Sequence, residues 1–262
     1  MKTADLGQLR AKKGFICDMD GVLYHGNRLL PGVQEFVDFL QRENKKYLFL
    51  TNSSERAPRE LAQKLSRLGL TVSEDHFYTS ALSTAAFLKA QCPGGSAYVI
   101  GEPGLVGALY EAGFTMNDVN PDYVVLGETR TYSYDKIEKA VSLVLKGAKL
   151  IGTNSDLTGP IENGIAPATR ALMAPIAMAT GRTAYYLGKP NPLMMKHGLH
   201  ILGVTPEESA IIGDRMDTDI ISGIESGIDT VLVLSGVTDI EEMKSFPYQP
   251  RYVLSGVGDI VP

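Results

Sequence analysis

Residues 14–22 read GFICDMDGV, a short apolar run that ends in a turn carrying two carboxylates. Four apolar residues before such a turn predict a buried strand. Asp18 and Asp20 follow it directly, and two acids this close can perform separate chemical tasks. A turn that uses Asp and Gly only for their backbone freedom is the simpler explanation of this fragment taken alone. A calcium loop is excluded, because Leu23 and Leu29 stand where that loop needs Gly and Glu.

Similar apolar runs recur along the chain and alternate with segments of helical spacing. After Pro31, Val33, Phe36, Val37 and Leu40 keep the i, i+3, i+4, i+7 pattern of one helix face. This alternation predicts βαβ units, and hence an α/β fold with a doubly wound, mainly parallel, Rossmann-like sheet. The further predicted strands are 47–50, 97–100, 123–126, 150–152, 184–187, 210–212 and 230–234.

The helix that follows the strand 47–50 is predicted from Leu61 and Leu65, which lie on one face. Ser53 or Ser54 is its expected N-cap, because a hydroxyl can accept a hydrogen bond from an N–H of the first turn.

Polar side chains stand where four predicted strands end, or just after: Asp18, Thr51, Lys189 and Asp214. The carboxyl ends of parallel strands share one edge of a sheet, where open α/β folds bind ligands. Two of these residues lie near each end of the chain, and the stretch between them has strands and helices of its own. We therefore expect a core made of residues 1–81 and 183–262, with residues 82–182 inserted as an α/β cap domain over the shared edge.

The composition is that of an ordinary globular protein. The 262 residues carry 25 Lys and Arg against 30 Asp and Glu, a net charge of −5, which disfavours a nucleic-acid partner. With only Cys17 and Cys92, the chain has no disulfide framework, and we expect a reducing compartment. Residues 1–13 lack the apolar stretch of a signal peptide, and prolines and an arginine interrupt residues 165–180. We therefore expect a cytoplasmic protein with no membrane span.

Two more fragments have a chemical interpretation beside a structural one. Residues 51–53, Thr-Asn-Ser, lie between a strand and a helix, where free N–H groups can bind an anionic oxygen, although helix capping explains them equally well. Lys189 stands in a rigid Gly-Lys-Pro turn, which is unusual for a solvated surface lysine, and Pro192 suits the first position of a helix.

Residues 213–219, GDRMDTD, place three acids after an apolar strand. The helix dipole explains acids in a first helical turn, but it explains Asp214 less well because Asp214 follows Gly213 at the strand end. Each fragment is ambiguous alone, but their order is specific. Asp-x-Asp-Gly-Val, Leu-Thr-Asn, Gly-Lys-Pro and Gly-Asp-Arg-x-Asp-Thr-Asp resemble, in that order, the four motifs of the haloacid dehalogenase (HAD) superfamily.

The insert narrows the resemblance. Its place between the second and third motifs resembles that of a type C2 cap. Residues 152–156, GTNSD, are similar to the Gly-Thr-Asn-Pro-Asp loop of the NagD-like, 4-nitrophenylphosphatase-like class, with Ser155 in place of the proline. The resemblance covers nearly the whole chain after the first dozen residues. It implies a hydrolase that releases phosphate from small phosphomonoesters.

By this resemblance, Asp18 is the nucleophile that forms an aspartyl-phosphate, and Asp20 protonates the leaving oxygen and then activates water. Two unit charges about 4 Å apart interact by about 4 kcal/mol at an effective dielectric constant of 20, so the acids and a phosphate need a cation, and Mg²⁺ fits. Its implied protein ligands are Asp18, the main-chain carbonyl of Asp20, and Asp214. Asp219 is expected close by, orienting a metal-bound water or Lys189, whose charge neutralises the nucleophile and the phosphoryl group.

The resemblance also implies how the substrate is held. Thr51, the backbone of Asn52 and Ser53 are expected to bind the phosphoryl oxygens. Asn154 and Asp156 of the insert are expected to read the leaving group. The expected partner is a small phosphorylated metabolite, such as a nucleotide or a sugar phosphate.

Other outcomes on this scaffold stay open, namely a phosphotransferase, a phosphonate hydrolase or a non-catalytic phosphometabolite-binding protein. A phosphonate hydrolase needs a Schiff-base lysine from the insert, and the sequence assigns that role to none of its candidates, Lys136, Lys139, Lys146 and Lys149. The apolar helices of the insert could also pair in a homodimer.

Several residues near the motifs are assigned to packing or to no role. Cys17 is expected in the core, and Met173 and Met178 are expected to pack within an Ala-rich helix. Tyr24 and His25 follow the first motif, where a lone histidine in a loop is more often incidental than functional.

Overall fold

The computed structural model describes residues 6–161 and 164–262, so residues 1–5 of the stretch considered for a signal peptide lie outside the described part. The chain forms two compact units. The first consists of Met1–Thr51, Ala62–Tyr78 and Lys189–Pro262, and the second of Asn52–Leu61 and Thr79–Gly188. The chain therefore crosses between them four times, directly after Thr51, Leu61, Tyr78 and Gly188.

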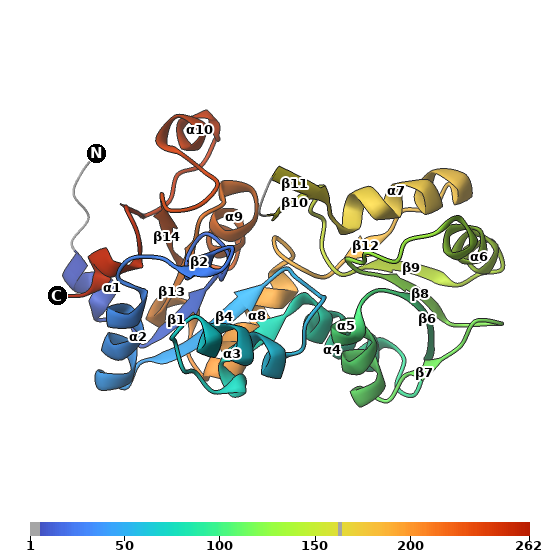
Figure 1. The fold of residues 1–262 in the computed structure, drawn as a ribbon, viewed down its shortest axis with the longest axis horizontal. Helices are drawn as coiled ribbons and strands as arrows, with labels where there is room; N and C mark the ends of the chain where they lie inside the picture. Colours follow the sequence, from blue (N-terminus) through green and yellow to red (C-terminus); the bar gives the residue numbers. More distant parts are fainter. Residues whose placement is uncertain (1–5, 162–163) are drawn as a thin grey trace. The chain divides into compact units, whose positions relative to one another are not determined.

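The first unit is built on a six-stranded sheet in which β15, β14, β13, β1 and β4 pair in parallel (Figure 1). In spatial order its strands are β15 (Tyr252–Leu254), β14 (Asp229–Val233), β13 (Ser209–Gly213), β1 (Gly14–Cys17), β4 (Lys46–Thr51) and β5 (Phe77–Thr79). A separate antiparallel hairpin joins β2 (Tyr24–His25) to β3 (Arg28–Leu29).

Helices cover both faces of this sheet because successive side chains of its strands point to opposite sides. On one face, Phe15 of β1 meets Phe36 edge-on, with ring centroids 6.3 Å apart. On the other, Ile16 and Leu48 lie against Gly198. The helices assigned to this unit are α1 (Leu6–Arg10), α2 (Val33–Arg42), α8 (Pro192–Leu202), α9 (Ile221–Glu225), α10 (Ile240–Ser245), the 3-10 turns η1 (Glu74–His76), η2 (Pro206–Glu208) and η4 (Val257–Ile260), and the π-helical turn η3 (Met216–Ile220).

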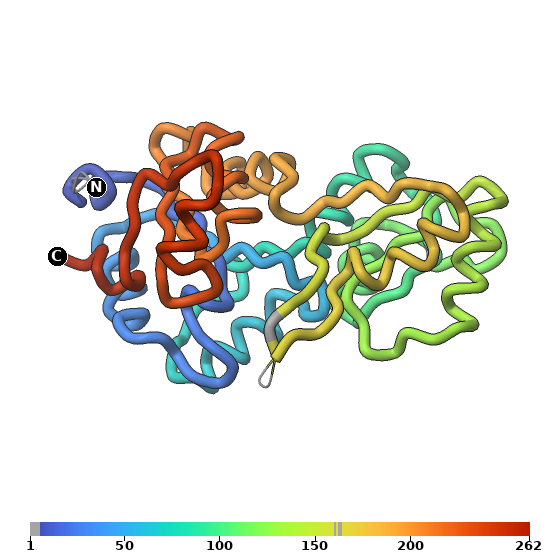
Figure 2. Tube along the Cα trace, turned by 90° about the horizontal axis from the view of Figure 1, so that it is seen from above, coloured from blue at the N-terminus to red at the C-terminus, as the bar shows by residue number. Residues whose placement is uncertain are grey.

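The two ends of the described chain meet within the first unit. Arg10 donates a hydrogen bond from Nε to the carbonyl of Ile260 at 2.6 Å, and Figure 2 shows the blue first helix beside the red end of the chain. This contact ties α1 to η4, the last helical turn.

The second unit has a five-stranded, wholly parallel sheet of its own. Figure 1 shows α4 and α5 on one side of this sheet and α6 and α7 on the other. An antiparallel hairpin joins β10 (Thr158–Ile161) to β11 (Gly164–Pro167). In spatial order the strands are β12 (Tyr185–Tyr186), β9 (Lys149–Gly152), β8 (Tyr123–Leu126), β6 (Ser96–Ile100) and β7 (Thr115–Met116), and the helices are α4 (Ser80–Gln91), α5 (Pro103–Glu111), α6 (Tyr134–Leu145) and α7 (Thr169–Thr180). Helix α3 (Pro58–Arg67) begins in the second unit and ends in the first.

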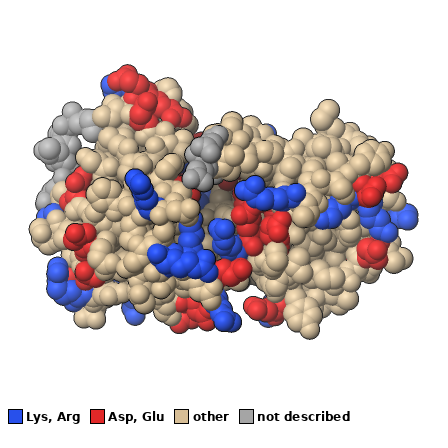
Figure 3. Space-filling view, in the orientation of Figure 1, with Lys and Arg blue, Asp and Glu red and all other residues tan. Residues whose placement is uncertain are grey.

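One face of the protein carries side chains of both charges. On the face shown in Figure 3, Lys and Arg side chains are interspersed with Asp and Glu. Within the described ranges, no helix combines the length and the hydropathy needed to cross a bilayer.

The predicted α/β class and parallel pairing are confirmed, and each predicted strand matches an observed one to within one residue at either end. The place of one strand was wrong. The strand predicted over 184–187 is β12, which pairs with β9 in the second unit, so Lys189 does not follow a strand of the sheet that holds Asp18, Thr51 and Asp214. An apolar run cannot show which sheet it joins, because strand pairing depends on distant parts of the chain.

Two smaller expectations were also wrong. Helix α3 begins at Pro58 rather than after Ser53 or Ser54, and Ser54 is buried, where its Oγ accepts a hydrogen bond from the Glu128 N–H at 3.3 Å. Met178 does not pack in a core, since its side chain is 84% exposed, whereas Met173 on the same helix is wholly buried. Cys17 is buried as expected, and Pro192 is the first residue of α8.

The two methionines of α7 provide a matched test of this packing. Met173→Ala should lower the free energy of unfolding by about 2–5 kcal/mol, because it leaves a cavity in the core of the second unit. Met178→Ala should change it by no more than about 0.5 kcal/mol. Urea unfolding followed by far-ultraviolet circular dichroism measures both. Equal losses in the two variants would contradict the burial described.

Candidate active site

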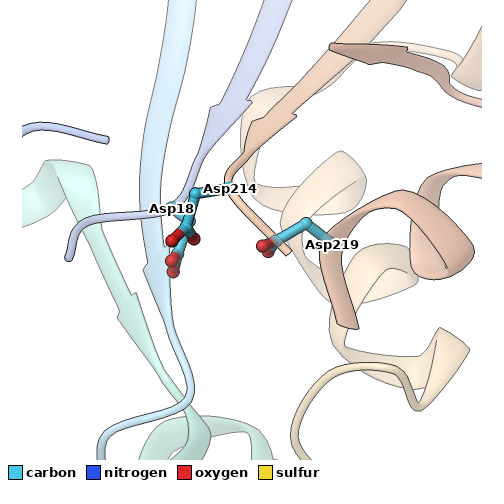
Figure 4. Close-up of side chains that lie close together, drawn as sticks. All are labelled: Asp18, Asp214 and Asp219. Atoms are coloured by element: carbon cyan, nitrogen blue, oxygen red, sulfur yellow. The ribbon is translucent and has the colours of Figure 1, made fainter. Parts of the chain in front are cut away.

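Two carboxylates leave the first sheet side by side. Strands β1 and β13 are parallel neighbours with Cys17 opposite Ile212, so Asp18 and Asp214 follow at the same sheet edge. The Asp18 N–H donates a hydrogen bond to the carbonyl of Ile212 at 2.8 Å, which continues the ladder by one residue. Figure 4 shows the two side chains together and Asp219 pointing toward them. One carboxylate oxygen from each of the three acids lies within 4.8 Å of the others.

A π-helical turn brings Asp219 to this edge. Such turns are rare and are often found at functional sites. In η3, the Arg215 N–H donates to Oδ2 of Asp219 at 3.2 Å, which holds the carboxylate against the loop after β13. A Cβ on Gly213 would lie 2.2 Å from Cβ and Cγ of Asp219. Glycine at 213 therefore allows this approach.

Lys189 lies among these acids. Its Nζ donates hydrogen bonds to Oδ1 of Asp18 at 2.6 Å, to Oδ1 of Asp219 at 2.7 Å and to the carbonyl of Leu50 at 3.4 Å. The residue is only 2% exposed. Burial by itself would lower the pKa of Lys189, but the ion pairs with Asp18 and Asp219 outweigh that effect and hold the pKa above its usual value. The ammonium is therefore a permanent positive charge in the site.

One ammonium does not balance three carboxylates. Burial raises the pKa of Asp214, and repulsion from Asp18 and Asp219 raises it further. Burial also raises the pKa of Asp219, although Lys189 opposes this. Repulsion from neighbouring carboxylates contributes to both shifts after burial, and a further cation would offset that contribution.

The donor set fits Mg²⁺, a hard ion that takes carboxylate and carbonyl oxygens. The Asp214 carboxylate is also closely confined. Its Oδ2 accepts a hydrogen bond from the Val237 N–H at 2.8 Å, and Cβ atoms on Gly21 and Gly236 would lie 2.4 and 2.0 Å from the same oxygen. Because Gly21 and Gly236 have no side chains, they leave space for the Asp214 carboxylate. The loop after β14 that contributes Gly236 was not predicted, because no motif marks it.

Asp20 lies in the turn after β1, outside the cluster of three carboxylates. Burial raises the pKa of Asp20, while Lys64 and His25 lower it. Nδ1 of His25 is 4.0 Å from Oδ1 of Asp20, and Nζ of Lys64 lies 3.6 Å from the centroid of the Tyr24 ring. Tyr24, His25 and Lys64 are therefore neighbours of Asp20. Lys64 was missed, since nothing in the sequence connects α3 with this turn.

The other predicted site residues divide between the units. Thr51 ends β4 in the first unit, whereas Asn52, Asn154 and Asp156 come together in the second. Nδ2 of Asn52 donates to Oδ2 of Asp156 at 2.8 Å, and Nδ2 of Asn154 donates to the carbonyl of Asn52 at 2.8 Å. The side chain of Ser53 in the same unit bonds to the carboxyl of Glu128.

Comparison with known proteins identifies the family. A haloacid dehalogenase-like hydrolase model matches residues 15–115, and a HAD-hydrolase-like model matches residues 186–260. The chain is 46% identical over 246 residues to the dihydroxyacetone phosphatase of Corynebacterium glutamicum (strain R), which covers 94% of this chain and 90% of that protein. This chain belongs to the haloacid dehalogenase-like hydrolases.

Further relatives agree with this assignment. The ribonucleotide monophosphatase NagD of Escherichia coli (strain K12) is 42% identical over 248 residues, covering 95% of this chain and 98% of NagD. The crystal structure of 4-nitrophenylphosphatase from Thermotoga maritima superposes with a TM-score of 0.93 at 34% identity, covering 97% of this chain and 98% of that one. This HAD-like hydrolase is a phosphatase, a phosphoric monoester hydrolase.

Glu128 is a titratable residue of the second unit that the sequence did not single out. It follows β8, and its carboxyl accepts a hydrogen bond from Nδ2 of Asn154 at 3.4 Å. Burial, and after it repulsion from Glu55 and Asp156, raises the pKa of Glu128 to about 7. Hydrogen bonds from Ser53 and Asn154 oppose this shift but do not cancel it. No motif marks this residue, because its environment depends on the folding of 53–55 against 154–156.

Replacing a glycine that confines Asp214 tests the proposal that this carboxylate binds Mg²⁺. Gly236→Ala places a methyl group 2.0 Å from Oδ2 of Asp214, so the carboxylate must move. We expect Mg²⁺ affinity, measured by calorimetry, to fall at least about tenfold. Gly256→Ala is the matched control, since a Cβ there meets nothing within 4 Å. Equal affinities in the two variants would argue against Asp214 as a ligand.

The raised pKa of Glu128 predicts a pH-dependent stability. Because the folded state holds this proton more tightly than the unfolded state, stability is lost as the pH rises from about 4.5 toward 7. Glu128→Gln should therefore be close to the parent in stability at pH 5 and more stable by about 1–3 kcal/mol at pH 8. Urea unfolding at the two pH values measures the difference. A difference that does not change with pH would refute the assignment.

Proposed function

We propose that this phosphatase hydrolyses small phosphomonoesters through an aspartyl-phosphate formed on Asp18. The observation that carries the proposal is the buried Lys189 ammonium, bonded to Asp18 at 2.6 Å and to Asp219 at 2.7 Å at the edge that also holds Asp214. In the first step an oxygen of Asp18 bonds to phosphorus while the bond from phosphorus to the leaving oxygen breaks.

The chain's own residues account for the charges and the proton. The ammonium of Lys189 offsets the charge that Asp18 and the phosphoryl group bring together. Asp20 gives its proton to the leaving oxygen, then takes one from the water that attacks phosphorus, so that inorganic phosphate is released and Asp18 is regenerated. Thr51 and the backbone of Asn52 and Ser53 bind the phosphoryl oxygens.

We propose Mg²⁺ as the cofactor, held by the carboxylates of Asp18 and Asp214 and the main-chain carbonyl of Asp20. When bound, the ion supplies positive charge to the phosphoryl oxygens. Asp219 would then fix Lys189, whose Nζ donates a hydrogen bond to its Oδ1, or would orient a water beside the ion. The crowding of three carboxylates around one ammonium supports this assignment.

The second unit is proposed to act as the cap that selects the substrate. Two relatives are named dihydroxyacetone phosphatase and ribonucleotide monophosphatase, which supports small phosphorylated metabolites of these kinds as substrates. The reducing, cytoplasmic location and the homodimer through the cap stay predictions.

Phosphate release from a panel of sugar phosphates and nucleoside monophosphates, with and without chelator, tests the function. We expect release that is abolished by EDTA and restored by Mg²⁺. Transfer of the phosphoryl group to an added alcohol in preference to water would indicate a phosphotransferase. Binding of the panel without release would indicate a non-catalytic protein.

Variants of Asp18 and Asp217 test which aspartate is the nucleophile. Acid quenching during turnover should trap a hydroxylamine-labile phosphoryl group on the parent protein and none on Asp18→Asn, whose turnover should fall by at least about a thousandfold. Asp217→Asn is the control, because Asp217 is exposed and pairs with Arg215 at 2.8 Å. It should behave as the parent does. Trapped phosphate on Asp18→Asn would rule out this nucleophile.

A further inference from the structure

The chain crosses between its two units beside two residues of the proposed phosphate site. The first of the four crossings follows Thr51 and the last precedes Lys189, so Asn52 and Gly188 are the second-unit residues at these two crossings. Both are held in one place. A Cβ on Gly188 would lie 2.7 Å from Oδ1 of Asn52, 2.7 Å from the carbonyl of Thr153 and 2.9 Å from Cβ of Asn154. The two crossings therefore pack against each other and against the loop after β9.

Hydrogen bonds hold both the backbone and the side chain of Asn52. Its carbonyl accepts from Nδ2 of Asn154 at 2.8 Å and from Oγ of Ser80 at 2.6 Å. Its own Nδ2 donates to Oδ2 of Asp156 at 2.8 Å. Both backbone and side chain of Asn52 are thus bonded within the second unit.

The side chain of Asn154 has little capacity left for a ligand. The residue is fully buried. Its Nδ2 donates to the carbonyl of Asn52 and, at 3.4 Å, to Glu128, which uses both amide hydrogens. Its Oδ1 accepts from the Asp156 N–H at 3.2 Å. The polar atoms of the Asn154 side chain are therefore used in hydrogen bonds to neighbouring residues rather than to a substrate.

We propose that Asn52, Asn154, Asp156 and Gly188 form a crossing clamp that sets the positions of Thr51 and Lys189, and that Asn154 and Asp156 are positioning residues rather than readers of the leaving group. Consecutive Cα atoms are about 3.8 Å apart, so a clamped residue limits where its neighbour can lie. This proposal rests on the proposed function of Thr51 and Lys189.

The clamp predicts a particular kinetic defect. Misplacing a phosphate-binding group by about 1 Å can cost about a hundredfold in rate. Asp156→Ala removes an acceptor of the Asn52 amide. We therefore expect kcat/KM to fall about 10- to 100-fold, and by the same factor for 4-nitrophenyl phosphate as for AMP. Asp156→Asn keeps an oxygen acceptor and should recover most of this loss. A reader of the leaving group would instead change the two substrates unequally.

Binding of inorganic phosphate supplies a measurement that needs no turnover. Calorimetry should show weaker phosphate binding for Asp156→Ala, and near-parental binding for Asp156→Asn and for the control Asp118→Ala. Asp118 is a 70%-exposed acid of the same unit. Far-ultraviolet circular dichroism checks that each variant is folded.

The outcomes separate the two proposals. Absence of phosphate release by the parent protein would overturn the proposed function, while weakened phosphate binding in Asp156→Ala would still support the clamp. Parental phosphate affinity in Asp156→Ala, or substrate-dependent losses, would overturn the clamp. Should Asp156→Ala be unfolded, Gly188→Ala, whose methyl group would press on Asn52 and Thr153, takes its place with the same expected losses.

Discussion

The ion pairing of one buried ammonium with several carboxylates is the constraint on which the first unit depends. Lys189 carries its charge in a place with almost no exposure, and a buried charge is tolerated only where partners surround it. Burial, with a smaller contribution from repulsion between the carboxylates, raises the pKa values of Asp214 and Asp219 above those of free carboxyls. The three carboxylates exceed the single ammonium in charge, which is why we propose a cation at this edge of the sheet.

The glycines follow from the same constraint. Gly21 and Gly236 lie in two different loops and Gly213 ends β13, and each lies where a methyl group would collide with Asp214 or Asp219. Only Gly21, with φ +76°, also has a backbone angle that disfavours other residues. At Gly213 and Gly236 glycine is explained by the space that the carboxylates occupy. The acids therefore require residues without a side chain beside them.

Much of this could be predicted from the residues themselves. Apolar runs and helical spacing located the strands, because burial requires those patterns, and the acids at the ends of β1 and β13 met as the parallel sheet predicts. Pairing between distant segments could not be predicted. The run 184–187 has the same character as the other strands, yet it joins the second sheet. The raised pKa of Glu128 and the place of Lys64 near Asp20 likewise depend on neighbours that only the fold brings together. Met178 is apolar, as a core residue would be, but its side chain faces solvent.

The four crossings of the chain have a practical consequence for engineering. If the second unit selects the substrate, as proposed, exchanging it between relatives would transplant substrate preference, and residues 79–188 form one continuous segment of that unit. Residues 52–61 belong to the same compact unit, however, and Asn52 is bonded to residues of that segment. A chimera that receives residues 79–188 alone from a relative would pair its own Asn52 with the relative's residues at positions 154 and 156. Transplanting both segments together preserves the donor's own junctions.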